Sequence, residues 1–150
     1  MGNFLIKFFA TSAFTGYAPY APGTFGTFVG VIVYLLFVKN IESQLIFLAF
    51  SIVYFIAGVL ISDRAEKLYG YKDAQKIVCD ETSGYLFSMF LIPATTRNII
   101  FAFLIFRIFD VVKPYPIRKL QNIRGGLGIM IDDLIAALYT NIVLHLIKMI

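Results

Sequence analysis

Three charged side chains lie three residues apart in a segment that is otherwise apolar. Arg107, Asp110 and Lys113 fall within residues 106–117, FRIFDVVKPYPI. On a helix this spacing places a cation, a carboxylate and a second cation along one face, and the two prolines that follow end the helix. Because charges on an apolar helix are costly, we expect these three to be paired, functional or both.

Two pairs of adjacent carboxylates each begin a further apolar segment, Asp80 with Glu81 and Asp132 with Asp133. Carboxylates at a helix start interact favourably with the helix dipole, so capping alone is one interpretation. Adjacent carboxylates also suit a hard cation. Together with Asp110, the two pairs could hold one or two Mg²⁺ ions, with water completing the coordination shell.

Cations beside these carboxylates suit a phosphate group. Arg107 can bind phosphate bidentately and Lys113 can act as a point charge. The alternative is that Arg107 and Asp110 form a buried pair that only organises the helix.

A glycine-rich loop, residues 21–27 (APGTFGT), leads into another apolar segment. Gly23 lets the backbone approach a ligand, and a helix start attracts anions. Thr24 and Thr27 add hydroxyl donors. The loop is not a Walker A motif, because no Gly-Lys-Ser/Thr follows it. The alternative is a plain helix entry capped by threonine.

Three familiar phosphatase nucleophiles are excluded by the sequence. A Cys-x5-Arg motif starting at Cys79 would need arginine at position 85, which is Tyr85. His145 is the single histidine, and no Asp-x-Asp-x-Thr run occurs. The remaining inventory of carboxylates and cations fits hydrolysis of a phosphate ester by a metal-activated water.

The composition is that of a membrane protein. The chain has 150 residues, 59% of them hydrophobic and 15% charged, with a mean hydropathy of +0.82, whereas soluble domains are about half apolar and a quarter charged. The net charge of +4 therefore favours an anionic membrane surface or a phosphorylated substrate over nucleic acid. A soluble protein with apolar core helices is the alternative, but it leaves little polar surface.

We predict one all-α domain over residues 1–150, a multi-helix integral membrane bundle of about four to five apolar helices with a polar site at one membrane face. A surface helix is expected at 4–15. Apolar helices are expected at 21–38, 44–62, 84–93, 99–112 and 129–150. Alternating crossings would put 1–20, 63–80 and 113–128 on one side, which the excess of Lys and Arg makes cytoplasmic. The short helices 84–93 and 99–112 could instead form a re-entrant hairpin.

Four stretches together resemble the phosphatidylglycerophosphatase A family of bacterial inner-membrane enzymes. They are 21–27 (APGTFGT), 77–84 (IVCDETSG), 105–118 (IFRIFDVVKPYPIR) and 125–138 (GGLGIMIDDLIAAL). The resemblance implies an all-α, multi-pass protein of the cytoplasmic membrane whose site faces the cytoplasm. It also implies a Mg²⁺-dependent reaction that converts phosphatidylglycerophosphate to phosphatidylglycerol and phosphate, with membrane lipids as partners and no nucleic acid. No oligomeric state follows from the sequence.

The residues are expected to divide into three roles. We predict catalytic roles for Asp80, Asp110 and Asp133, phosphate binding by Gly23, Thr24, Thr27, Arg107 and Lys113, and metal binding by Asp80, Glu81, Asp132 and Asp133. The alternative function is a non-enzymatic membrane cation-binding or carrier protein, since acidic residues beside membrane helices also occur in ion paths. A carrier should place charges through the membrane depth, and residues 21–38 and 44–62 carry none.

Overall fold

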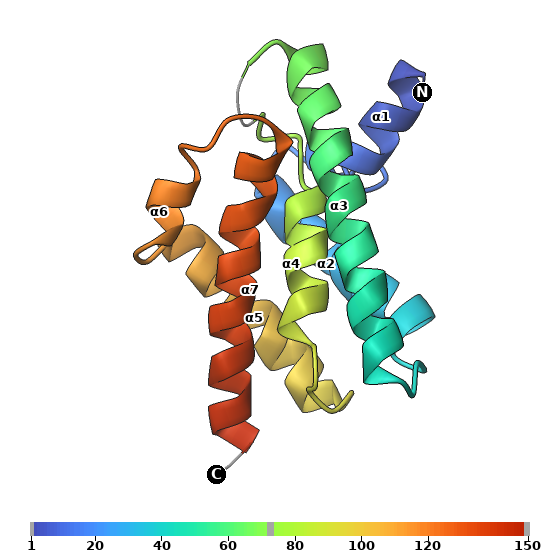
Figure 1. Ribbon diagram of the computed structural model, residues 1–150, viewed down its shortest axis with the longest axis vertical. Helices are drawn as coiled ribbons and strands as arrows, with labels where there is room; N and C mark the ends of the chain where they lie inside the picture. Colours follow the sequence, from blue (N-terminus) through green and yellow to red (C-terminus); the bar gives the residue numbers. More distant parts are fainter. Residues whose placement is uncertain (1, 72–73, 149–150) are drawn as a thin grey trace.

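The computed structural model describes residues 2–71 and 74–148, and every regular element in these ranges is helical (Figure 1). The predicted all-α class is therefore confirmed. The elements are α1 (Asn3–Ala10), η1 (Thr15–Tyr17), α2 (Pro22–Val33), η2 (Tyr34–Val38), α3 (Gln44–Tyr69), α4 (Cys79–Ser88), α5 (Thr96–Val112), α6 (Ile117–Leu120) and α7 (Gly126–Lys148).

Local signals explain where the two longest middle helices begin and end. The hydroxyl of Ser43 accepts a hydrogen bond from the Ile46 amide at the start of α3, and that of Thr95 does the same at the start of α5. Helix α3 ends at Gly70, whose φ of +80° suits glycine. Helix α5 ends at Lys113, directly before a proline.

Helix α3 is longer than the predicted apolar segment 44–62, because its polar last turns stay helical. Lys67 and Asp63 lie one turn apart there and form an ion pair of 2.6 Å. Helix α4 covers the predicted segment 84–93 only in part, because it begins at the acidic pair and ends at Ser88. The last predicted helix begins three residues early, and its final residues, 149 and 150, lie outside the described residues.

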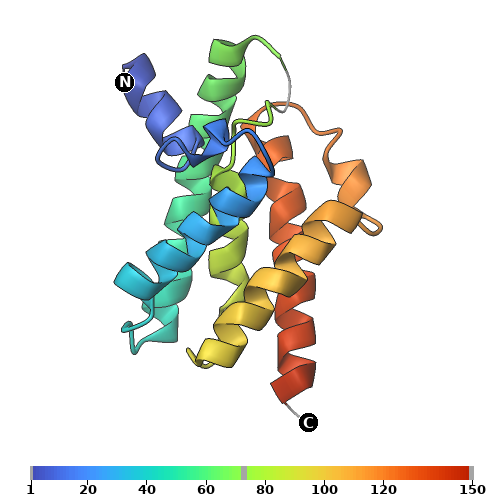
Figure 2. The same ribbon diagram turned by 180° about the vertical axis from the view of Figure 1, so that it is seen from behind.

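The short helix α4 lies at the centre of the bundle, between α3 and α7 in one view and behind α2 and α5 in the other (Figures 1 and 2). Tyr85 and Leu86 of α4 are fully buried. A Cβ at Gly26 of α2 would lie 2.7 Å from the Cβ and the carbonyl oxygen of Val78, so the small residue lets α2 approach this close. The amide of Asn141 on α7 donates to the carbonyls of Ser88 and Phe90 at 3.0 and 2.7 Å, which fixes the end of α4.

Two helices have the length and hydropathy of a membrane span, α3 and the 126–147 part of α7. Helix α3 has a mean hydropathy of 2.6 in its most apolar window, and only 22% of that window is buried inside the protein, which leaves apolar surface for contact with lipid. The apolar helix at 22–38 is shorter. The predicted number of four to five crossings stays a prediction.

The polar segments gather at one end of the bundle. Helix α1, the end of α3, helix α6 and the start of α7 all lie at the upper end in Figure 1. This arrangement matches the predicted grouping of segments 1–20, 63–80 and 113–128. The side of the membrane on which that end lies stays a prediction.

A candidate metal and phosphate site

A cavity of about 550 Å³ opens at the polar end, where the starts of α2, α4 and α7 meet the end of α5. Two predicted clusters and the charged face of α5 line it together. Its charged lining residues are Asp80, Glu81, Arg107, Asp110, Lys113, Asp132 and Asp133. The fold therefore brings together charged groups that are far apart in the sequence, since Asp80 and Asp133 are separated by 53 positions.

Three carboxylates form a cluster suited to a cation. Asp80, Glu81 and Asp133 offer oxygens that all lie within 4.8 Å of one another. One buried oxygen of each carboxylate has no hydrogen-bond donor within the described part of the chain: Oδ1 of Asp80, Oε2 of Glu81 and Oδ2 of Asp133. Buried polar atoms are normally satisfied. Oxygen donors left in this state fit Mg²⁺, which prefers carboxylates and water as ligands.

The three charges of α5 form a chain of ion pairs along the cavity wall. Nη1 of Arg107 lies 2.5 Å from Oδ2 of Asp110 and 3.8 Å from Oε1 of Glu81. Nζ of Lys113 lies 3.7 Å from Asp110 and 2.7 Å from Asp132. Asp110 thus holds both cations, and each cation also reaches a carboxylate from another helix.

Gly23 in the first turn of α2 is in close contact with this network. A Cβ at this position would collide with Oε1 of Glu81 and would lie 3.1 Å from both terminal nitrogens of Arg107. Glycine lets the backbone come this near the two charged groups without displacing them. The start of α2 therefore forms one wall of the cavity, as the glycine-rich loop predicted.

The charged lining of the cavity has excess negative charge. Its five carboxylates and two cations sum to a formal charge of −3, counting each group once. Burial, followed by the charges of Glu81 and Asp133, raises the pKa of Asp80 well above its usual value, and burial also raises the pKa of Glu81. Burial works against the charge on Lys113, but the hydrogen bond to Asp132 and the negative charges of Asp132, Asp110 and Asp133 together outweigh it and raise the pKa of the lysine. A bound divalent cation would reduce the electrostatic repulsion among the carboxylates.

Thr24 and Thr27, which were predicted to bind phosphate, do not line the cavity, and Asp132, which was predicted to bind metal, is hydrogen-bonded to a lysine. The buried hydroxyl of Thr27 donates to the carbonyl of Gly23 at 2.9 Å, and neither Thr27 nor Thr24 lines the cavity. Asp132 lies outside the three-carboxylate cluster and instead accepts the hydrogen bond of Lys113. The structure thus gives Thr27 a helix-internal contact and Asp132 a lysine partner, while the predicted binding roles of both stay predictions.

Two uncharged polar side chains at the cavity were missed by sequence reasoning. Tyr20 and Gln75 line it from the loops before α2 and α4. Neither belongs to a charged pair or a periodic pattern, so the sequence carried no signal for them.

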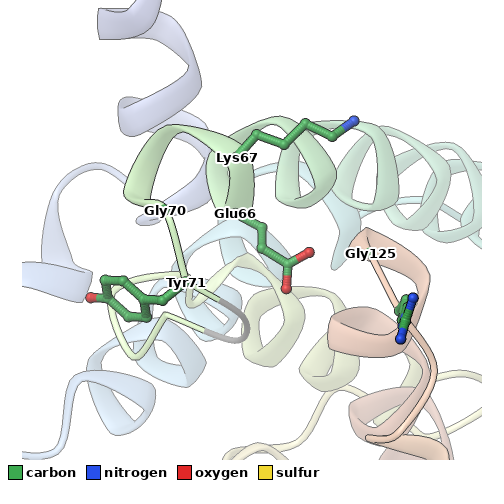
Figure 3. Close-up of a pocket in the computed structure, with 6 residues that line it drawn as sticks. Glu66, Lys67, Gly70, Tyr71 and Gly125 are labelled. Carbon is green, nitrogen blue, oxygen red and sulfur yellow. The ribbon is translucent and has the colours of Figure 1, made fainter.

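A second cavity, of about 420 Å³, lies between the end of α3 and the start of α7 (Figure 3). Glu66 points into the space facing Gly125, and Lys67 extends away from it. Lys67 is exposed and paired with Asp63. No cluster of metal-ligand spacing occurs there within the described residues, whereas the first cavity holds one.

Comparison with known proteins identifies the family of the chain. A family model described as phosphatidylglycerophosphatase A matches residues 8–148. The chain belongs to the phosphatidylglycerophosphatase A family. Its members' name denotes a phosphoric monoester hydrolase, and this chain is an enzyme of that class.

Three relatives cover most of the chain. Proteins named phosphatidylglycerophosphatase A are 35% identical over 128 residues in Haemophilus influenzae and 33% identical over 138 residues in Escherichia coli, covering 84% and 89% of this chain and 78% and 77% of the relatives. A Bacteroides thetaiotaomicron protein, provisionally named a phosphatidylinositol-3-phosphatase, is 33% identical over 148 residues, covering 95% of this chain and 92% of the relative. No solved structure matches the chain.

Proposed function

We propose that this chain hydrolyses the terminal phosphate monoester of phosphatidylglycerophosphate and releases phosphatidylglycerol and inorganic phosphate. Membership of the phosphatidylglycerophosphatase A family supports the reaction. The observation that carries the site assignment is one cavity lined by a cluster of three carboxylates, Asp80, Glu81 and Asp133, and by two cations.

Asp80, Glu81 and Asp133 are the proposed Mg²⁺ ligands. Their clustered oxygens and the three atoms without donors support this assignment. When bound there, Mg²⁺ would supply positive charge to the phosphoryl oxygens and make water more acidic. Asp132 takes a supporting role, since its hydrogen bond holds the ammonium of Lys113 at the cavity.

Arg107 and Lys113 bind the phosphate group. The ion pairs that Arg107 makes with described residues run through Nη1, which leaves its other N–H groups for phosphate oxygens. The start of α2 at Gly23 adds the positive end of a helix dipole. Asp110 is a positioning residue, because it contacts both cations and fixes their separation.

In the proposed reaction, water attacks phosphorus and the bond from phosphorus to the glycerol oxygen breaks. The proton lost by water passes to the carboxylate cluster, and the glycerol oxygen takes up one proton on leaving. The cations offset the charge that develops on the phosphoryl oxygens in the transition state.

A location in the bacterial cytoplasmic membrane accompanies this function. Two helices of spanning length and a lipid substrate support membrane insertion. The polar end carries the cavity and most of the Lys and Arg residues, which supports a multi-pass arrangement with the site facing the cytoplasm. The carrier alternative is not favoured, because the described residues hold one metal-type cluster, at one end of the bundle.

Phosphate release from purified protein tests the proposal. In neutral detergent micelles, we expect Mg²⁺-dependent release from phosphatidylglycerophosphate, abolished by EDTA and reduced at least about 100-fold in Asp80→Asn and Asp133→Asn. Glu42→Gln, an exposed carboxylate in the loop before α3, is the matched control and should keep full activity. Phosphatidylinositol 3-phosphate is assayed alongside; a faster rate on that lipid would overturn the substrate assignment.

A further inference from the structure

A hollow of about 430 Å³ adjoins the catalytic cavity on the far side of Lys113. It is lined by Val112, by the Pro-Tyr-Pro segment 114–116 and by Arg118 and Lys119 of α6. Lys113 lines both spaces, so the two are neighbours along the chain and in the fold. None of the roles assigned above uses the hollow.

The hollow has an unneutralised positive charge. Arg118 and Lys119 are exposed, and neither forms an ion pair with a carboxylate among the described residues. Arg118 donates to the carbonyl of Val112 at 3.2 Å, and Nζ of Lys119 lies 5.0 Å from the ring centre of Tyr115. These contacts hold the two cations at the edge of the hollow without neutralising their charge.

An exposed apolar stripe on α5 leads to the hollow. Ile100, Leu104, Ile108 and Val111 recur at helical spacing on one face, and each is at least half exposed. Tyr115, 75% exposed, stands at the end of the stripe. This order matches the layers of a membrane: apolar residues contact hydrocarbon, an amphipathic ring lies at the interface, and cations contact lipid phosphate.

We propose that this hollow binds the phosphodiester of the substrate lipid while the terminal phosphate occupies the catalytic cavity. This inference rests on the proposed function. Phosphatidylglycerophosphate carries two phosphates joined by one glycerol unit, and the two spaces are joined by one residue, Lys113. The acyl chains lie along the α5 stripe, the phosphodiester meets Arg118 and Lys119, and the monoester reaches Arg107. The hollow thereby selects lipids with a negative charge at the phosphodiester.

The double variant Arg118→Gln/Lys119→Gln tests the inference in neutral micelles that contain no other anionic lipid. We expect KM for phosphatidylglycerophosphate to rise about tenfold while kcat changes less than about twofold, since the lost contacts are made equally before and during the reaction. Arg97→Gln is the matched control, because Arg97 is an exposed cation 5.4 Å from the ring centre of Phe101, at the start of α5 and so at the end of that helix away from the hollow. It should leave both constants unchanged.

A measurement of product binding tests this inference independently of the proposed reaction. Native mass spectrometry with dihexanoyl phosphatidylglycerol, which has a phosphodiester and no monoester, should show about tenfold weaker retention in the double variant and none of that loss in Arg97→Gln. If the double variant keeps the KM and the lipid binding of the wild type, the inference is overturned. It is also overturned if the KM of the double variant rises only in anionic vesicles, because that result would reflect general attraction of the protein to an anionic membrane. A wild-type protein that binds the product but releases no phosphate would refute the proposed function and leave the hollow standing.

Discussion

Replacing Gly23 by alanine should separate stability from activity. The added Cβ collides with Oε1 of Glu81 and approaches both terminal nitrogens of Arg107 to 3.1 Å. The Glu81 carboxylate must retreat by roughly 1 Å to restore ordinary contact, and a displacement of that size in a catalytic group can cost about 100-fold in rate. The helix itself should tolerate or favour the change, because alanine is better than glycine in a helix by up to about 1 kcal/mol.

The assay is phosphate release from phosphatidylglycerophosphate beside thermal unfolding in the same detergent. We expect kcat/KM to fall about 100-fold with an unchanged or higher melting temperature. Gly26→Ala, one turn further along α2, provides the contrast, since its Cβ would collide with Val78 in the packed interface with α4. That variant should lose stability. Full activity in Gly23→Ala would refute the reasoning that the position of Glu81 matters to the reaction.

Three further variants test other parts of the structure. Arg107→Lys keeps the charge but loses the planar fork, so we expect kcat to fall at least about 100-fold; a change below threefold would make Arg107 a mere charge partner of Asp110. Asn141→Ala should lower the free energy of unfolding by about 1–3 kcal/mol in chemical denaturation, because two carbonyls at the end of α4 lose their donor; unaltered stability would contradict the capping role. For Lys113 the folded-state pKa is raised above the usual 10.5, so its stabilising contribution is present below pH 10.5 and is lost as the pH rises through the folded-state pKa. The stability gap between wild type and Lys113→Met should therefore be constant to about pH 10 and narrow above 10.5; a constant gap through pH 11.5 would contradict this ion-pair account.

Apolar runs and turn residues were enough to predict most helices. The apolar segments at 21–38, 44–62, 99–112 and 129–150 all contain a helix, because long apolar stretches between polar turns leave the backbone few other ways to satisfy its hydrogen bonds. Helix ends were harder. The last turns of α3 are polar, and hydropathy does not measure the features found there, the ion pair between Lys67 and Asp63 and the end of the helix at Gly70.

The site was predictable by residue type but not by orientation. Asp132 and Asp133 are neighbours, and successive helical side chains point about 100° apart, so the sequence could not tell which one joins Asp80. Thr27 was expected at a helix start, yet α2 already begins at Pro22, and Thr27 falls one turn after Gly23 and donates to its carbonyl. The hollow at α6 is lined by residues of one short segment, 112–119, but its shape depends on how the chain turns between α5 and α6, which the residue types alone do not give.

The most direct test of the central claim is a Mg²⁺ titration of phosphate release by protein that has first been stripped with EDTA. Wild type and Glu42→Gln should regain activity along the same saturating curve, while Asp133→Asn should stay inactive or need far more Mg²⁺. Full activity without any divalent cation, or identical curves for wild type and Asp133→Asn, would contradict the assignment of Asp80, Glu81 and Asp133 as the metal site.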